Sequence, residues 1–246
     1  MNVLVIGDRF SDMAVRYLSD IADSAREQMY VCSLTVNTAS TYEAYWRSLY
    51  TKSKDASMSV NGMRTPLTVS IHDVLASRRF DAIVIHQGAR ESCNPLQYTD
   101  YLPLIEKRLH KYAPAARILV SEPWAYKDGS PVLTNTMGYE SAEKMAEDIV
   151  RTVADAVENA EGIFGIVPFC EVLRASLSEG LDMYDSPKDP SDIGKYVLSL
   201  ILYLCLSKKQ VTGNKFSDFD TDIGADTAEL AKRCAQECAK ARGWRE

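Results

Sequence analysis

The sequence of 246 residues has few histidines and no closely spaced cysteine pair, and these scarcities exclude several classes of protein. None of its six cysteines form a Cys-x-x-Cys pair, which excludes zinc-ribbon and thioredoxin-like redox sites. Lysine and arginine form no basic run, and the formal net charge of -6 argues against a nucleic-acid-binding protein. The three histidines are His72, His86 and His110, so chemistry that needs histidine has few candidate positions.

Long apolar runs are also missing. The longest, at residues 196–206, is too short to span a bilayer, and Met1 leads directly into a strand pattern without signal-peptide features. We therefore expect a cytoplasmic protein with reduced thiols and no membrane contact. Apolar residues make up 46% of the chain and charged residues 25%, which is typical of a globular protein. The length fits one domain over residues 1–246.

Short β-branched runs alternate along the chain with longer helical patterns. The runs predict strands at residues 3–6, 29–34, 81–85, 117–120 and 162–167. The helical patterns cover residues 11–27, 98–112, 139–159, 172–178, 191–206 and 227–241. Because the strand runs are continuously apolar, they indicate a parallel sheet that is covered on both faces. The sequence thus predicts a doubly wound α/β fold with five parallel strands.

An insertion at about residues 40–75 departs from this alternation. Two alternating segments flank Asn61-Gly62, a dipeptide typical of hairpin turns, so we expect a small hairpin or an extra edge strand. One helical face of the insertion is aromatic and is expected to pack internally or to mediate a homodimer. The members of this face are Tyr42, Tyr45, Trp46 and Leu49.

Functional groups of a doubly wound sheet lie beyond the carboxyl ends of its strands. This rule points to the loops that begin at Gly7, Leu34, His86 and Ser121. A tight turn between a strand and a helix, as at Gly7, suits an anion or an oxyanion. Gly7 is the only glycine of its loop, so the Gly-x-Gly-x-x-Gly pattern of dinucleotide sites is absent and we predict no cofactor.

The side chains of these loops have both structural and chemical interpretations. Ser11 is expected to be a helix N-cap. His86 is the only histidine at a predicted strand end, where it is either a base or a structural side chain. Gln87 could offer an amide N–H to an oxyanion. Asp8 or Glu91 would orient His86 if His86 were a base.

The motifs at the strand ends, taken in order, resemble those of SGNH/GDSL hydrolases. Gly7-Asp8 followed by Phe10-Ser11 resembles the first block of that superfamily, in particular a branch with a Gly-Asn-Ser-Phe-Ser opening known as a domain of unknown function. Six further segments follow the order of the family, at residues 32–34, 85–89, 124–126, 166–168, 191–196 and 212–214. The resemblance covers nearly the whole chain.

The resemblance implies a flavodoxin-like three-layer α/β/α fold. In active members a first-block serine attacks an ester, helped by a C-terminal Asp-x-x-His. The oxyanion is held by the N–H of that serine, a second-block glycine and a third-block Asn or Gln, and Gln87 stands at the last of these positions. The residues expected to line a ligand site are Asp8, Ser33, Glu91 and Trp124.

The catalytic positions of the family are mostly substituted. Arg9 stands where the serine is expected, and residues 186–191 align so that Ser186 replaces the aspartate and Asp189 the histidine. No histidine follows His110, so no shift of the alignment restores the base, and the second-block glycine is also missing. A guanidinium cannot attack an acyl carbon, so we expect the triad chemistry to be absent.

Arg9 and Asp189 replace two residues that touch in the active family. We therefore expect them to form an ion pair that fills the former catalytic centre, partly buried and with room for bidentate contact. If the pair were buried, Arg9→Ala would cost about 3–5 kcal/mol, because Asp189 would keep an unpaired charge.

Two functional interpretations follow from the strand-end residues. In the first, the chain is a non-hydrolytic SGNH-like protein in which Arg9 receives an anionic or acylated small molecule, or which binds a partner protein. In the second, it is an esterase, acylhydrolase or deacetylase with a relocated site, in which Ser11, Ser33 or Ser121 is the nucleophile and His86 the base. The spacing selects no one trio.

A third interpretation concerns an acidic segment near the end of the chain. Residues 218–229 approach the spacing of a calcium loop, but Ile223 stands where the sharp turn requires glycine. We expect instead a solvated loop that caps the last helix, with Asp226 as its N-cap, and we predict no metal site.

Overall fold

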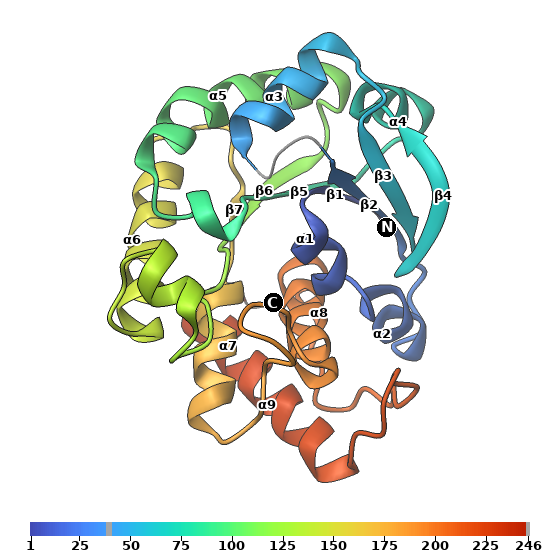
Figure 1. The fold of residues 1–246 in the computed structure, drawn as a ribbon. Helices are drawn as coiled ribbons and strands as arrows, with labels where there is room; N and C mark the ends of the chain where they lie inside the picture. Colours follow the sequence, from blue (N-terminus) through green and yellow to red (C-terminus); the bar gives the residue numbers. More distant parts are fainter. Residues whose placement is uncertain (38–40, 245–246) are drawn as a thin grey trace.

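The fold is built on a central sheet, and the computed structural model describes it over residues 1–37 and 41–244. Within these residues the sheet has seven strands in the order β4-β3-β2-β1-β5-β6-β7 (Figure 1). The strands that pair in parallel are β1 (Asn2–Gly7), β2 (Tyr30–Val36), β5 (Ala82–His86), β6 (Arg117–Ser121) and β7 (Gly165–Val167). The antiparallel strands are β3 (Ala56–Val60) and β4 (Met63–Val69).

The five parallel strands are the ones that the sequence predicts, and the α/β class is confirmed. The sheet is larger than the five strands expected, because the insertion adds β3 and β4 to one edge. Asn61 and Gly62 connect them with φ angles of 49° and 73°, the left-handed geometry that a two-residue hairpin turn requires. Residue 40, where the expected insertion begins, lies outside the described residues.

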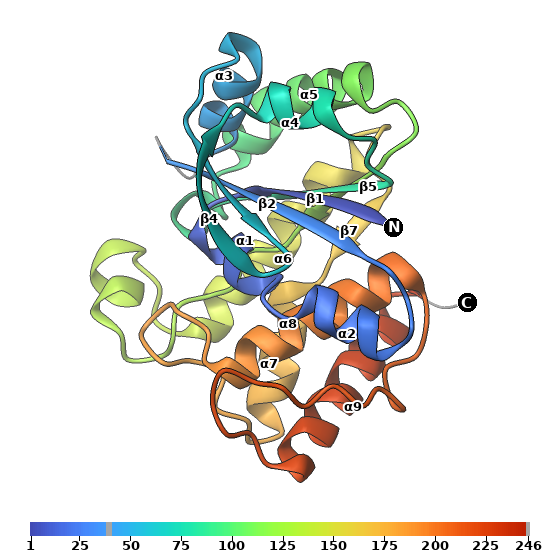
Figure 2. The ribbon, with the colours of Figure 1, turned by 90° about the vertical axis from the view of Figure 1, so that its right-hand side faces the viewer.

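Helices cover both faces of the sheet and give three layers (Figure 2). On one face lie α1 (Arg9–Ala14), α2 (Leu18–Ser24), α7 (Phe169–Ser178), α8 (Asp192–Ser207) and α9 (Ala225–Ala241). On the other lie α3 (Tyr42–Thr51), α4 (Ile71–Ser77), α5 (Pro95–Tyr112) and α6 (Ala142–Glu158). Two short helical turns are η1 (Ala89–Glu91) and η2 (Val132–Thr136).

The central strand β1 shows why the strand runs are continuously apolar. Its side chains alternate between the two faces, so Val3 and Val5 enter the core beneath α8 while Leu4 and Ile6 enter the core beneath α5. All four are buried. The aromatic face of α3 packs internally, as one of its two interpretations predicts, since Tyr42, Tyr45 and Leu49 are fully buried.

The helix predicted at residues 11–27 is two helices, α1 and α2, and a side chain of α8 explains the break. The Ser199 hydroxyl donates to the carbonyl of Ala14 at 2.9 Å and accepts from the amide of Tyr17 at 3.2 Å. A side chain that takes these two backbone groups interrupts the i→i−4 ladder of the helix. No pattern within residues 11–27 carries this information, because the cause lies 182 residues away.

Two smaller expectations are also corrected. The fifth strand is shorter than predicted, because the amide of Ile163 donates to Ala160 in a turn rather than to a neighbouring strand. Asp226 is not the N-cap of the last helix, since α9 begins at Ala225 and Gly224 precedes it. Within the described residues, no helix has the length and apolar character needed to cross a bilayer.

The turn between β3 and β4 gives a stability test. A Cβ on Gly62 would lie 2.2 Å from the carbonyl oxygen of Arg16, whereas a Cβ on Gly180, at a similarly positive φ, would meet nothing within 4 Å. Both alanine variants suffer left-handed strain, but only Gly62→Ala adds a clash with backbone. We expect Gly62→Ala to lose about 1–3 kcal/mol more free energy of unfolding than Gly180→Ala in urea denaturation. Equal losses would show that the β3–β4 turn does not pack against Arg16.

Candidate functional site

The carboxyl ends of β1, β5 and β6 bring together a buried polar group of three side chains. His86 and Ser121 are paired in the register of β5 and β6, and the His86 Nδ1 lies 2.7 Å from the Ser121 Oγ. The other ring nitrogen, Nε2, lies 4.0 Å from Asp8 Oδ1. The structure thus selects Ser121 and Asp8 as the neighbours of His86, which the spacing in the sequence did not do.

This polar group is sealed from solvent. His86 is 1% exposed and Ser121 is 0% exposed, and the rings of Trp124 and Phe169 pack against the imidazole. Burial lowers the pKa of His86, although nearby Asp8 acts in the opposite direction. The imidazole therefore lies between a hydroxyl and a carboxylate and out of contact with solvent.

Ser11 does not have the role that the sequence predicts. The N-cap of α1 is Asp8, whose carboxylate accepts from the amide of Phe10 at 2.9 Å. Ser11 lies inside the helix, and its hydroxyl donates to the Asp8 carbonyl at 2.6 Å. A Cβ on Gly7 would lie 2.6 Å from the Ser11 Oγ and 2.9 Å from the His86 Cβ, so only glycine leaves room for this approach.

The remaining predicted site residues are dispersed. The Glu91 carboxylate accepts from the side-chain amide of Asn94 at 2.8 Å, and no hydrogen bond or ion pair joins Glu91 to His86. Ser33 is buried within β2, and its hydroxyl has no partner among the described residues. Gln87 is fully buried, with its oxygen accepting from the Gly88 amide while its Nε2 finds no partner among the described residues. Gln87 therefore keeps a free buried donor beside the centre.

Arg9 and Asp189 form an ion pair, as their alignment predicts. The contact joins Arg9 Nη2 to Asp189 Oδ1 alone, so the pair is not bidentate. The Arg9 side chain is 49% exposed and that of Asp189 is 27% exposed, which makes the pair half-buried at most. Ser186 helps to fix the position of Asp189, because the Ser186 hydroxyl accepts from the Asp189 backbone amide at 3.1 Å.

Trp124 joins the ion pair to the sealed polar group. The indole contacts the His86 ring at 5.5 Å between centroids and the Phe10 ring at the same distance. Its Nε1 donates to the carbonyl of Lys188 at 3.1 Å, which ties the loop at residues 185–190 to the edge of the sheet. The loop that carries Asp189 is therefore held against Trp124, whose ring packs on His86.

Three further residues belong to the surroundings of Asp8, and of these only Arg90 was not singled out from the sequence. Tyr45 and Tyr126 both lie near enough to Asp8 for its charge to raise their pKa, although burial is the larger cause in each. Arg90, close to the Tyr126 hydroxyl, acts in the opposite direction. Tyr45 and Tyr126 belong to segments that the sequence did single out, the aromatic face of the insertion and the motif at residues 124–126. The signal for Arg90 was its position in the loop after β5.

Glu122, also missed, is a fully buried carboxyl directly after β6. Its Oε1 accepts from Arg242 Nη2 at 2.9 Å, its Oε2 has no partner among the described residues, and Arg242 also pairs with Glu171. Burial, with a smaller contribution from Glu171, raises the pKa of Glu122 to about 8. The signal in the sequence was a charged residue placed at the end of an apolar strand.

The acidic segment at residues 218–229 is used for internal contacts. Asp220 pairs with Arg16 at 2.5 Å, and the Thr221 amide and hydroxyl donate to Asp192. Across the described residues, His, Cys, Asp and Glu side chains form no group of three or more suited to a metal ion. The calcium interpretation therefore gains no support from the geometry.

The exposure of the Arg9–Asp189 pair predicts a small energetic coupling. In a double-mutant cycle with Arg9→Ala and Asp189→Ala, we expect a coupling of about 0.2–1 kcal/mol in the free energy of unfolding, because water screens the pair. This coupling is smaller than the loss of about 3–5 kcal/mol that Arg9→Ala would cause in a buried pair. A coupling of about 3 kcal/mol or more would mean that the pair is desolvated in solution.

The buried Glu122 predicts a pH-dependent stability. Because its folded pKa of about 8 lies above the ordinary 4.5, the folded state holds a proton that the unfolded state releases. The stability from this proton is fully present below pH 4.5 and is lost as the pH rises through 8, at up to about 1.4 kcal/mol per pH unit. We expect Glu122→Gln to flatten the dependence of unfolding free energy on pH in urea denaturation between pH 5 and 8. Glu147→Gln, at an exposed position of α6, should leave that dependence unchanged. An unaltered slope in Glu122→Gln would contradict the assignment.

Solved structures with similar folds agree with this architecture. A crystal structure of a DUF4886 family protein from Bacteroides uniformis superposes with a TM-score of 0.88 at 20% identity, covering 100% of this chain and 96% of that one. A protein from Slackia heliotrinireducens assigned to the SGNH hydrolases gives a TM-score of 0.59 at 17% identity, over 82% of this chain and 97% of that one. A GDSL-like lipase from Parabacteroides merdae gives 0.51 at 14% identity, over 87% and 96%.

These likenesses establish the SGNH-hydrolase-like fold, and the sequence resemblance is confirmed at that level. No curated protein sequence matches the chain. The family model described as a domain of unknown function, DUF4886, matches residues 2–238. The chain with its strand-end polar group and its Arg9–Asp189 pair belongs to the DUF4886 family.

Proposed function

We propose that this chain is a non-hydrolytic protein of the SGNH fold that binds a small anionic molecule at Arg9. The observation that carries the proposal is the Arg9–Asp189 ion pair. Its two members stand at the positions where the family resemblance expects the nucleophilic serine and the histidine base. A pair of opposite charges at these positions can hold a ligand, but it supplies neither a nucleophile nor a base of suitable pKa.

The other serines near the centre do not replace the missing nucleophile. The hydroxyl of Ser11 is directed to the Asp8 carbonyl, and Ser33 is enclosed within the sheet. Ser121 has the hydrogen bond to His86 that an activated serine needs, but both side chains are sealed beneath Trp124. Catalysis at any of these positions would require the centre to open first.

The surroundings of Arg9 favour an anion as the ligand. The guanidinium offers five donors, and Asp189 occupies one of its terminal nitrogens. Lys188 lies on the same Phe10 ring, with Arg9 at 4.8 Å and Lys188 at 5.9 Å from its centroid. Two cations thus lie near one aromatic ring, and one of them is paired with Asp189. Because the whole chain carries a net charge of -6, a small anion is proposed rather than a nucleic acid.

Phosphate and short acyl carboxylates are the ligand classes to test first. Both match the planar fork of Arg9, and the carboxylates follow from the likeness to a GDSL-like lipase. We expect inorganic phosphate or butyrate to raise the melting temperature of the wild-type protein, since a ligand that binds only the folded state stabilises it. At a concentration one hundred times the dissociation constant the gain is about 2.7 kcal/mol.

Arg9→Ala should abolish this thermal shift. The matched control is Arg47→Ala, which removes another surface arginine that is also paired with a neighbouring carboxylate, Glu43. We expect Arg47→Ala to keep the shift in full. Loss of the shift in both variants, or in neither, would show that the anions act on the overall charge of the protein rather than at Arg9.

A relocated esterase is the second candidate function, and one contact favours it. The 2.7 Å hydrogen bond between His86 and Ser121, with Asp8 4.0 Å beyond, has the order of a nucleophile, a base and an orienting carboxylate. The buried Nε2 donor of Gln87 would then serve the oxyanion. Movement of the loop at residues 185–190 would be needed to admit an ester.

A further inference from the structure

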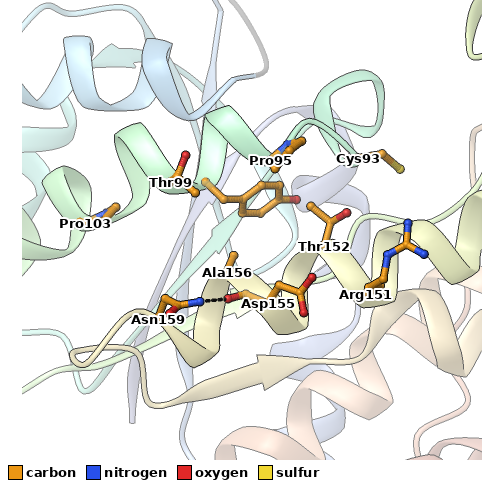
Figure 3. A pocket seen from close by; sticks show the side chains of 10 residues that line it. Cys93, Pro95, Thr99, Pro103, Arg151, Thr152, Asp155, Ala156 and Asn159 are labelled. Atoms are coloured by element: carbon orange, nitrogen blue, oxygen red, sulfur yellow. Dashed lines mark hydrogen bonds between the residues drawn. The ribbon is translucent and has the colours of Figure 1, made fainter.

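A hollow lies between α5 and α6, apart from the strand-end site (Figure 3). It encloses about 450 Å³, which is within the range of small-molecule sites. In the close-up, Pro95, Thr99 and Pro103 of α5 face Thr152, Asp155 and Ala156 of α6 across the opening. None of the residues that line it belongs to the strand-end polar group or to the Arg9–Asp189 pair.

The inner wall of this hollow is apolar. Tyr98 is 2% exposed, and its hydroxyl donates to the carbonyl of Ser92 at 3.1 Å. The ring of Tyr98 is therefore left as the part that meets the hollow. Pro95, Pro103 and Ala156 complete the apolar surface. An occupant needs an apolar body that can lie against a ring and two prolines.

A break in the hydrogen bonds of α5 adds an acceptor to the rim. Pro103 lies inside the helix and has no N–H, so the carbonyl of Thr99 lacks its i+4 donor. A helix carbonyl points along the axis from its own residue toward the residue four positions later. Because Thr99 and Pro103 both line the hollow, this gap in the helix hydrogen bonds lies on that side of the helix.

The charges at the rim favour a cation. Arg151 is paired with Asp148 at 2.5 Å, which offsets its charge. Asp155 has no cationic partner within 4.0 Å among the described residues. The Asn159 side-chain amide donates to the Asp155 backbone carbonyl at 2.8 Å (Figure 3), and no hydrogen bond within the described residues reaches the Asp155 carboxylate. Among the lining residues, the charge without an opposite partner is therefore the Asp155 carboxylate.

We propose that the hollow between α5 and α6 binds a small organic ammonium ion with an apolar body. The ammonium group donates to the Asp155 carboxylate and the Thr99 carbonyl, while the apolar body packs on the Tyr98 ring, Pro95 and Pro103. The proposal is independent of the anion site at Arg9, because the two sites share no residue and take opposite charges.

Three ligands of one shape test the charge preference. 2-Phenylethylammonium, 2-phenylethanol and phenylacetate carry the same ring with a cationic, a neutral and an anionic head. For a ligand of this size we expect the ammonium to bind with a dissociation constant on the order of 1 mM. The other two should bind at least tenfold more weakly. Amide chemical shifts in the ¹⁵N-labelled full chain report both the affinity and the place of binding.

Two substitutions test the two acceptors separately. Asp155→Asn keeps the shape but removes the charge, and should weaken ammonium binding at least tenfold. Pro103→Ala restores a donor for the Thr99 carbonyl, and should weaken binding severalfold while it stabilises the helix. Glu147→Gln removes a charge from α6 outside the hollow and should change nothing.

The outcomes separate the proposal from its alternatives. Shifts confined to residues that line the hollow, lost in Asp155→Asn and kept in Glu147→Gln, support the site. Equal binding of the alcohol and the ammonium would overturn the charge argument. Equal weakening by Asp155→Asn and Glu147→Gln, or shifts spread over the acidic surface, would show non-specific attraction and overturn the site itself. Failure here leaves the thermal-shift test of Arg9 unaffected.

Discussion

The fold depends on one constraint, that the five parallel strands are covered by apolar helices on both faces. The alternating residues of β1 enter two separate cores, so neither face of the strand has room for a polar side chain. Charged groups are therefore expected at the strand ends, and the carboxyl ends of parallel strands meet at one edge. Asp8, His86, Ser121 and Glu122 all lie at this edge, although they come from three strands. The site is thus a consequence of the sheet.

Burial at this edge has opposite effects on the two kinds of ionisable group. It lowers the pKa of His86 and raises that of Glu122, so both are held in their neutral forms at pH 7. Arg9, Asp189 and Lys188 lie farther out, where water still reaches the side chains, whereas the Asp8 carboxylate lies at the edge itself, beside His86. The cations of the proposed anion site thus lie outside the buried polar group and nearer to water.

Local patterns in the sequence were sufficient for much of the fold. Continuous apolar runs predicted the five parallel strands, and Asn61-Gly62 predicted the hairpin, because each signal lies within the segment that it shapes. The alignment with the family motifs also predicted the contact between Arg9 and Asp189. The break after α1 could not be predicted, since the hydroxyl of Ser199 that causes it comes from α8. The partners of His86 were similarly undecided, because strand register, not spacing, places Ser121 beside it.

The central claim of the proposal is that none of the serines within residues 1–37 and 41–244 is an activated nucleophile. Intact-mass analysis after treatment with a fluorophosphonate probe, on protein shown to be folded by circular dichroism, tests it most directly. The account predicts no adduct, since Arg9 stands where the family resemblance expects the nucleophile, and Ser121 is fully buried near Trp124. A stoichiometric adduct would contradict it. Peptide mapping of that adduct to Ser121 would establish the relocated site instead.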